Sequence, residues 1–436
     1  MRRHVQRNTR HWHELPPSAA RLTNSLRDIG HDFPTAIADL VDNSVAAGAN
    51  RVDVDLKFEG SHSYVVVNDD GSGMTAGELR EALRFGTRRE YGVGDLGRYG
   101  LGLKTAPLSQ GRRVTVVTRR SPTRAVIAAL ALDLDLIEEY DEWFVLEPEQ
   151  SEGLQQATQR LRHTSGTCVI LDKLDRVLPE RRPSGGWARR RLALLAERTA
   201  MHLSMVFHRF LEGKAGEGSL TITVNGEEIK AWNPFAEDEE ETQTLDMQEF
   251  ELNTNSGSGL VRFRGHVLPP RDAFSSLAAF ERLSGPQKWN RQQGLYIYRG
   301  NRLVQWGGWN GLRSLDEHTK LARASLDFHA DLDDLFRINV AKMRVLLPAE
   351  LKSMIERPIH ELCALADERY RGSGGRRAHN NEVTDDSRNI VPPPASHVGL
   401  AIKAAAMELG YGHALREIEA LLSERDPAVA KYLGFR

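Results

Sequence analysis

Residues 36–44 read Ala36-Ile-Ala-Asp-Leu-Val-Asp-Asn-Ser44, and this short stretch decides how the fold is interpreted. The residues that recur at the i, i+3, i+4 and i+7 positions of one helix face are Ile37, Leu40, Val41 and Ser44. Pro34 is tolerated in the first turn of such a helix, and Ala47-Gly-Ala-Asn50 is typical of a C-terminal stop. The spacing therefore predicts a helix with one buried face.

A second face of this helix carries Asp39 and Asn43, which are four residues apart. The amide oxygen of Asn43 can bind a hard cation such as Mg²⁺, and the Asp39 carboxylate can orient a water molecule. An ordinary helix with a solvated polar side shows the same pattern. The two residues alone do not decide between these interpretations.

Two glycine-rich stretches follow along the chain. An apolar strand expected at 64–67 runs into Asn68-Asp-Asp-Gly-Ser-Gly-Met74, which contains the pattern Asp69-x-Gly-x-Gly73. The second stretch is Gly97-Arg-Tyr-Gly-Leu-Gly-Leu-Lys104. Each stretch alone is common in turns. In this order, and after the helix at 36–44, they form a specific joint signal.

The three stretches resemble the nucleotide site of the GHKL ATPases, which include gyrase B subunits, heat-shock chaperones, sensor histidine kinases and MutL-type proteins. Asp39-x-x-x-Asn43 resembles the N box of this family, and Asp69–Gly73 resembles its adenine-binding box. Gly97–Lys104 resembles its phosphate-binding box, and Gly166-Thr167 resembles its late Gly-Thr pair. The resemblance covers roughly residues 20–230 and implies ATP and Mg²⁺ as ligands.

The resemblance implies a role for each motif residue. Asp69 would accept a hydrogen bond from the adenine amino group, Asn43 would be the magnesium ligand, and Asp39 would activate the attacking water. The other expected nucleotide-binding positions are Gly71, Gly73, Met74, Gly97, Gly100, Leu101, Gly102, Lys104, Thr105 and Thr167. The alternative for Asp69 is a turn aspartate bonded to its own backbone, and for Lys104 a surface lysine.

Asp39 departs from the family pattern, because these ATPases usually carry a glutamate at this position. Aspartate is one methylene shorter, so we expect slow turnover more than weak nucleotide binding. Asp42 lies on the same helix and is a less favoured substitute for the base, and Asp70 is a weaker candidate than Asp69 for the adenine contact.

The order of predicted elements indicates an α+β fold. A helix, two strands, a helix, a glycine loop and another helix precede several strands, which suits a two-layer α/β sandwich of the Bergerat type. The expected strands are Arg51–Phe58, Tyr64–Val67, Arg113–Thr118, Ala125–Leu132, Trp143–Leu146 and Thr167–Leu171. The strict β-α-β alternation of a doubly wound fold is not present.

A second α/β domain is expected to follow, with its strands starting at Ser219–Val224. The hairpin signals Asn225-Gly226 and Gly300-Asn301 lie within it, and Pro348–Arg369 reads as its closing helix. This part resembles the transducer domain of the family, and Lys342 is the best match for the lysine that senses the γ-phosphate, with a surface lysine as the alternative. The expected divisions are a leader or strap (1–20), the ATP-binding domain (21–215), the transducer-like domain (216–371), a linker (372–397) and a small helical C-terminal segment (398–436).

Composition excludes several classes of protein. The net charge is −2 and there are two cysteines, so neither a strongly basic nucleic-acid binder nor a disulfide framework is expected. The sequence has no apolar run long enough for a membrane span and no signal peptide, so we expect a cytoplasmic protein without a membrane partner. The arginines at 181–191 suit either a phosphate backbone or a solvated surface.

The sequences of the motifs most resemble those of MORC-type and related prokaryotic ATPases. That resemblance implies an ATP-gated clamp, in which residues 86–98 form a lid, Lys342 senses the nucleotide and two subunits close as a homodimer with the leader as a strap. Prokaryotic relatives of this type resemble parts of antiviral defence or repair systems, so DNA and a partner nuclease or helicase are the expected clients.

Three other functions remain as alternatives. One is a chaperone-like ATPase that acts on protein clients, and another is a nucleotide-binding regulator that hydrolyses little ATP. A sensor-type kinase is disfavoured, because no phosphoacceptor histidine on a dimerising helix fits within residues 1–35.

Overall fold

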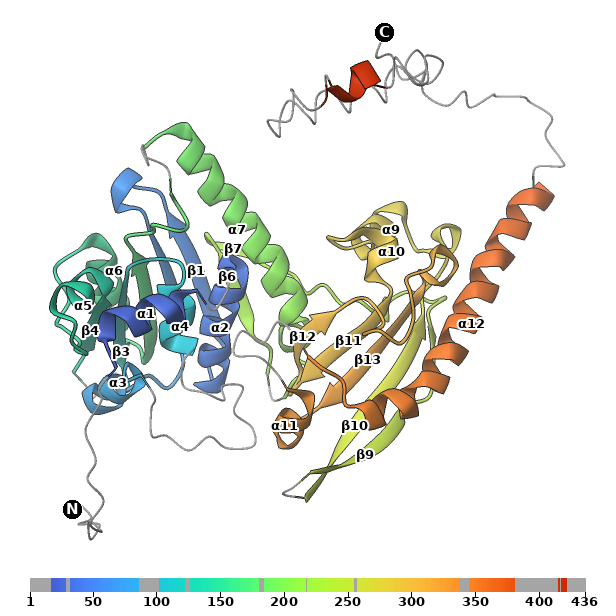
Figure 1. The fold of residues 1–436 in the computed structure, drawn as a ribbon, viewed down its shortest axis with the longest axis horizontal. Coiled ribbons are helices and arrows are strands. Elements are labelled where there is room, and N and C mark those ends of the chain that lie inside the picture. Colours follow the sequence, from blue (N-terminus) through green and yellow to red (C-terminus); the bar gives the residue numbers. More distant parts are fainter. Residues whose placement is uncertain are drawn as a thin grey trace. The chain divides into compact units, whose positions relative to one another are not determined.

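The computed structural model describes residues 17–28, 32–85, 102–121, 126–179, 184–216, 218–254, 257–337, 345–380, 415 and 417–421 (Figure 1). The chain divides into two compact units, Met1–Ser373 and Gly374–Arg436. Both sheets belong to the first unit. In the second unit, residues 415 and 417–421 are helical, as expected for that segment.

The first sheet has the strand order β4-β3-β5-β2-β1-β6-β7 (Figure 1). Its strands are β1 (Arg51–Lys57), β2 (Tyr64–Asp69), β3 (Arg113–Arg119), β4 (Ala128–Asp133), β5 (Gly166–Asp172), β6 (Thr221–Val224) and β7 (Glu227–Glu228). All neighbours pair antiparallel except β1 and β6, which are parallel. The Asp69 motif begins at the end of β2, and Gly166-Thr167 are the first residues of β5, which is the neighbouring strand.

The helices of this part are α1 (Ala19–Arg27), α2 (Phe33–Ala46), α3 (Ala76–Ala82), α4 (Gly102–Leu108), α5 (Leu134–Tyr140), α6 (Glu152–Leu161), α7 (Gly186–Val206) and α8 (His208–Leu211), with a 3-10 turn η1 (Gly60–His62). Helices α2 and α7 pack together over one face of the sheet, in the main hydrophobic core. Helix α6 packs on the other face, against the outward side chains of β2, β3 and β5. The fold is thus the expected α+β sandwich, with one additional helix on the second face.

Helix α2 forms where the sequence predicts it. Asp32 is its N-cap and accepts a hydrogen bond from the Thr35 amide at 3.0 Å, and Pro34 lies in the first turn. The predicted apolar face is buried, with Ile37, Leu40 and Val41 in the core. Fourteen residues of helix therefore present a fixed set of polar side chains to the neighbouring strands.

The second sheet has the order β12-β11-β13-β10-β8, with β9 paired to β10. Its strands are β8 (Gln243–Thr244), β9 (Gln248–Thr254), β10 (Gly257–Val267), β11 (Gly294–Arg299), β12 (Arg302–Trp306) and β13 (Ala322–Phe328). The remaining elements are α9 (Leu277–Leu283), α10 (Lys288–Gln292), α11 (Asp333–Phe336) and α12 (Ala349–Asn380), with the 3-10 turns η2 (Arg271–Ala273), η3 (Glu317–Thr319) and η4 (Ala330–Leu332). Leu351, Ile355 and Ile359 of α12 are buried in the core of this sheet.

Several expectations about the elements are wrong. The strands expected to open the second domain, β6 and β7, complete the first sheet instead, because β6 pairs in parallel with β1. The strand expected at 143–146 is reduced to a single bridge between Ala131 and Leu146. Helix α12 continues to Asn380, into the expected linker, although it contains three glycines at 372, 374 and 375 that each cost about 1 kcal/mol relative to alanine.

Some predicted features lie outside the described residues. They are residues 1–16 of the leader, residues 86–98 of the proposed lid, and residues 381–397 of the linker. None of the helices among the described residues has the length and apolar character needed to cross a membrane.

Candidate functional site

Asp69, at the end of β2, is the centre of the candidate site. Its carboxylate is 8% exposed. Oδ1 accepts hydrogen bonds from the backbone amides of Gly71 and Thr167, both at 3.0 Å, and Oδ2 accepts one from the Ser44 hydroxyl at 3.0 Å. One side chain therefore ties the turn after β2 to helix α2 and to strand β5.

The charge state of Asp69 reflects two opposing effects. Burial raises the pKa of this carboxyl, and the hydrogen bonds from Gly71, Ser44 and Thr167 act in the other direction without cancelling it. An ionised carboxylate has about four acceptor positions, and three are used here, which leaves about one for a ligand. The bond to Gly71 fulfils the turn-aspartate alternative, and the bonds to Ser44 and Thr167 go beyond it.

Two glycines are required by the close approach of the backbone around Asp69. Gly73 has φ +61°, and a Cβ atom there would lie 2.1 Å from the Arg119 carbonyl oxygen. Gly166 has φ +137°, and its Cβ would lie 2.1 Å from the Asp69 carbonyl oxygen. The motif glycines are therefore fixed by sterics as well as by conformation.

Thr118 is a site residue that the sequence did not reveal. Its hydroxyl accepts a hydrogen bond from the Met74 amide at 2.9 Å and donates one to the Gly166 carbonyl at 3.0 Å, and it lies 3.1 Å from the Thr167 hydroxyl. It joins the two ends of the site across β3 and β5. Its only signal in the sequence is a polar residue at the end of an apolar strand.

Asp70 has a purely structural environment. Its Oδ1 accepts hydrogen bonds from the backbone amides of Asn50 and Arg51, at 2.8 and 2.9 Å. These bonds close the turn between α2 and β1. From the sequence, Asp70 likewise ranks below Asp69 as a candidate for the adenine contact.

Asn43 is exposed on α2, next to Ser44 in sequence. A Cβ atom built on Gly102, the first residue of α4, would lie 4.0 Å from the Asn43 side-chain nitrogen. The start of the phosphate-binding motif's helix therefore lies beside Asn43. Thr105 is buried one turn further along α4.

The structure thus brings together a large part of the predicted set, namely Asn43, Asp69, Gly71, Gly73, Met74, Gly102 and Thr167. Gly97, Gly100, Leu101 and Lys342 lie outside the described residues, so their roles stay predictions.

Lys104 occupies an environment that the sequence did not predict. Its side chain is fully buried, so the surface-lysine alternative is wrong. The ammonium group donates to the carbonyl oxygens of Ala82 and Arg84, at 2.9 and 2.7 Å, and so ties α4 to the end of α3. Burial lowers the pKa of Lys104 to about 8. These contacts are with backbone carbonyl groups shortly before the proposed lid, and they give no support to a phosphate contact.

Asp39 and Asp42 lie on a face of α2 that is buried rather than solvated. They are 2% and 1% exposed. Arg302, on β12 of the second sheet, donates from Nε to Asp42 Oδ1 at 2.8 Å, and its Nη2 lies 3.7 Å from Asp39 Oδ1. Asp42 is engaged in this ion pair, which argues against it as a substitute base. No sequence pattern indicated Arg302, because its partner Asp42 is 260 residues away.

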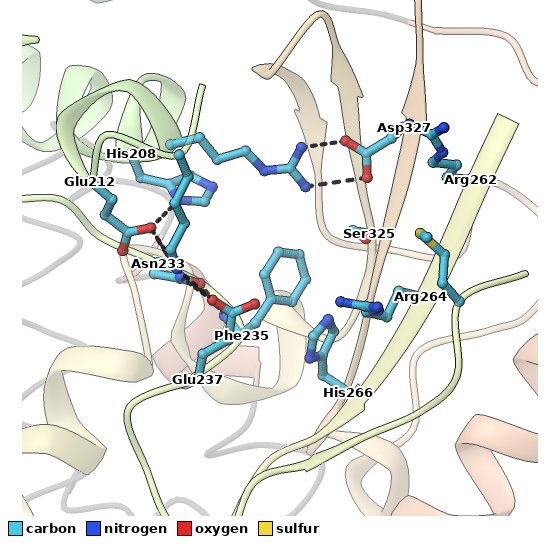
Figure 2. A pocket seen from close by; sticks show the side chains of 13 residues that line it. His208, Glu212, Asn233, Phe235, Glu237, Arg262, Arg264, His266, Ser325 and Asp327 are labelled. Carbon is cyan, nitrogen blue, oxygen red and sulfur yellow. Dashed lines mark hydrogen bonds and ion pairs between the residues drawn. The ribbon is translucent and has the colours of Figure 1, made fainter. Parts of the chain in front are cut away.

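A separate cavity of about 130 Å³ lies between α8, the segment around Phe235, and strands β10 and β13. Figure 2 shows His266 stacked beside Phe235 and Arg264 next to His266. Most charges in this cavity pair with one another: Arg209 with Asp327, and Lys214 with Glu212 and Glu237. We therefore interpret this cavity as a polar junction between α8 and the second sheet.

Comparison with known proteins agrees with this geometry. Residues 31–167 match the family model of histidine kinase-, DNA gyrase B-, and HSP90-like ATPases. This range contains Asn43, Asp69 and Gly102. It ends at Thr167, whose amide binds Asp69.

Curated relatives match parts of the chain. The ATPase morc-1 of Caenorhabditis elegans is 34% identical over 98 residues, which are 22% of this chain and 11% of the relative. The DNA mismatch repair protein MutL of Halobacterium salinarum is 39% identical over 92 residues, which are 20% of this chain and 14% of the relative. MutL of Pseudoalteromonas translucida is 24% identical over 263 residues, 57% of this chain and 38% of the relative. The chain thus spans only between about a tenth and two fifths of these relatives.

Residues 31–167 are therefore similar to the ATPase domain of the GHKL superfamily, and the α+β fold agrees with that class. Its relatives include both MORC and MutL proteins. The more specific prokaryotic branch expected from the motifs stays a prediction.

The adenine assignment of Asp69 leads to a first prediction. Asp69→Asn keeps an oxygen for the Gly71 and Thr167 amides, so the free energy of unfolding should change by no more than about 1 kcal/mol. The same change places an amide where the adenine amino group would donate, so ATP affinity should fall roughly 100-fold. Calorimetric titration with a non-hydrolysed ATP analogue measures this, with thermal unfolding as the control. Unchanged affinity would remove the assignment.

Burial of Lys104 leads to a second prediction. Between the folded pKa of about 8 and the ordinary value of 10.5, the unfolded chain binds more protons than the folded one. The free energy of unfolding should therefore rise with pH in this window, by at most about 1.4 kcal/mol per pH unit. Below pH 8 this contribution should be flat.

Lys104→Met removes the titrating group and is the matched comparison. Denaturant unfolding of both proteins near pH 7, 9 and 10 gives the difference between them, in which the titration of other groups cancels. Parallel curves for the two proteins over this range would show that Lys104 has an ordinary pKa.

Proposed function

We propose that this protein is a Mg²⁺-dependent ATPase that works as an ATP-gated dimeric clamp in a DNA-associated system. The observation that carries the proposal is the set of bonds around Asp69, which links α2, β2 and β5, and Asn43 is the neighbour in sequence of Ser44, one of the bonded residues. Matches to the GHKL family model and to MORC and MutL proteins support the nucleotide.

In this proposal the remaining acceptor position of Asp69 binds the adenine amino group. Gly71 and Gly73 keep the backbone turn after β2 tight, and Gly71 has no room for a side chain, because a Cβ would lie 2.9 Å from the Ala47 Cβ. The bonds of Thr118 to Met74 and Gly166 hold the opposite wall. All of these groups are ordered by contacts within the protein, so little reorganisation is needed on binding.

The donor chemistry fits a magnesium ion of the kind that this family uses. Among the described residues, no group of three or more His, Cys, Asp or Glu side chains could hold a metal ion alone. A single exposed amide, Asn43, suits an ion that takes most of its ligands from phosphate oxygens and water. When bound, the ion would neutralise phosphate charge.

Asp39 is the proposed base, and its surroundings favour slow turnover. Its carboxylate is shorter than the usual glutamate, is 2% exposed, and has a guanidinium nitrogen 3.7 Å away. These features also favour a second candidate function, that of a nucleotide-binding regulator that hydrolyses little ATP.

The clamp and its clients are proposed by analogy with the relatives. Two of these relatives are named DNA mismatch repair proteins, and DNA is therefore the first client to test, with a nuclease or helicase as a further partner. A lid at residues 86–98, a sensor at Lys342 and an exchanged N-terminal strap are the moving parts that this proposal requires. ATPase activity that does not respond to DNA would favour a chaperone-like function instead.

The role of Asp39 gives a third prediction. Asp39→Asn keeps the size of the side chain and removes the base, so phosphate release should fall by about 10²–10⁴-fold while ATP affinity stays within about threefold. Asp39→Ala should behave in the same way. Release of phosphate is measured in single-turnover assays, and affinity by calorimetry. Persistent release in both variants would mean that another group is the base.

The clamp gives a fourth prediction. A non-hydrolysed ATP analogue with Mg²⁺ should shift the protein from monomer to dimer in sedimentation velocity, and ADP should not. Asp69→Asn, which should not bind the analogue, is the matched control and should stay monomeric. A wild-type protein that binds the analogue and stays monomeric would contradict the clamp but not the nucleotide site.

A further inference from the structure

Arg302 connects the second sheet directly to the helix that carries the proposed catalytic residues. It is the first residue of β12, and it reaches Asp42 on α2 with a hydrogen bond of 2.8 Å from Nε. The terminal nitrogen Nη2 of the same guanidinium lies 3.7 Å from Asp39 Oδ1. One guanidinium group therefore lies beside two carboxylates that are one helical turn apart.

All three side chains are withdrawn from water, at 1% to 3% exposure. Buried charges are tolerated when they are paired, and removal of one partner leaves the other uncompensated. The guanidinium lies 3.7 Å from the Asp39 carboxylate and 2.8 Å from that of Asp42, so its charge acts on two buried carboxylates. The guanidinium is planar, so the bond from Nε to Asp42 also restricts where Nη2 can lie relative to Asp39.

Helix α7 closes this cluster from a third side. His202 on α7 lies edge-on to Trp306 of β12, with ring centroids 5.7 Å apart. Burial and the nearby charge of Arg302 together lower the pKa of His202 to about 4, so this imidazole is neutral at pH 7. It adds no positive charge that would replace Arg302.

We propose that Arg302 is a positioning residue for ATP hydrolysis, which holds the Asp39 carboxylate in its working orientation and makes that orientation depend on the second sheet. The inference rests on the proposed function, because it takes Asp39 as the base. Asp42 is the anchor in this arrangement: it fixes the guanidinium through Nε and leaves Nη2 directed toward Asp39.

Through this arrangement the second sheet can affect the site without contacting the nucleotide. A shift of β12 relative to α2 would move the guanidinium away from Asp39 before it affected the Asp69 end of the site. ATP binding would then be retained while the base lost its orientation. Catalysis is sensitive to such displacements, since a misplacement of about 1 Å can cost about 100-fold in rate.

The test compares Arg302→Ala with a matched variant at the same junction. Arg209, on α8, pairs with Asp327 of β13 through two hydrogen bonds, and the dashed lines to Asp327 in Figure 2 mark them. Its guanidinium also lies 3.5 Å from the centre of the Tyr298 ring. Arg209→Ala thus removes an arginine that links α8 to the second sheet. The described contacts of this arginine are not with α2.

Four measurements separate positioning from a general loss of structure. They are the melting temperature, the affinity for a non-hydrolysed ATP analogue, and the kcat and KM of ATP hydrolysis. Arg302→Ala should lower kcat by about 100-fold and leave analogue affinity within about threefold. Arg302→Lys keeps the charge without the fork and should recover part of the loss, and Arg209→Ala should keep kcat within about threefold of the wild type.

Removal of one member of a buried ion pair can also prevent folding. The double variant Asp42→Asn/Arg302→Gln replaces the hydrogen-bonded pair by two neutral amides, so it removes the positioning charge without leaving the charge of Asp42 uncompensated. It should fold cooperatively, bind the analogue, and show the same loss of kcat as Arg302→Ala.

The outcomes are distinguishable from a failure of the proposed function. If the wild type hydrolyses ATP and the folded Arg302 variants keep its kcat, or lose no more than Arg209→Ala does, the positioning role is wrong and the ATPase assignment stands. If Arg302→Ala loses analogue affinity together with kcat, the residue supports the whole site and not the base. A wild type that binds the analogue without hydrolysing ATP overturns the proposed hydrolysis and this inference with it.

Discussion

The structure of the site depends on one buried carboxylate. Asp69 is placed where water cannot solvate it fully, and an ionised carboxylate in such a position is costly unless donors surround it. The protein meets this requirement with two backbone amides and one hydroxyl, drawn from three different elements. The backbone around Asp69 also has no room for side chains at Gly73 and Gly166, where a Cβ atom would meet the carbonyl oxygens of Arg119 and Asp69.

The same carboxylate explains which parts of the site were predictable. A motif such as Asp69-x-Gly-x-Gly73 encodes its own geometry within a few residues, so the sequence is enough to locate it. Helix α2 was predicted for the same reason, since its cap, its proline and its apolar spacing are all local. The contact of Thr167 with Asp69 required the family resemblance, because 98 residues separate them and no local rule joins them.

Other features could not be read from local patterns. The polar side of α2 looked like a solvated face, but burial of Asp39 and Asp42 depends on an arginine of the second sheet. Lys104 looked like a phosphate ligand or a surface lysine, and its carbonyl partners at the end of α3 become neighbours only in the folded chain. Strand β6 was assigned to the second domain because it follows the long helix α7, yet it pairs with β1 at the start of the chain. In each case a long-range contact overrode the local interpretation.

These contacts leave α2 held at two points by different parts of the protein. Ser44, near its end, is bonded to Asp69 and thus to the first sheet, and Asp42 is bonded to Arg302 and thus to the second. Both points lie within one turn of Asn43. A helix is stiff over this length, so a displacement of either sheet must be transmitted to the polar side chains between them or must break one of the two bonds. The ion pair is the more expensive bond to break, because its charges are buried. The position of the second sheet is therefore coupled to the residues proposed to bind magnesium and activate water. This coupling does not require the nucleotide to contact that sheet.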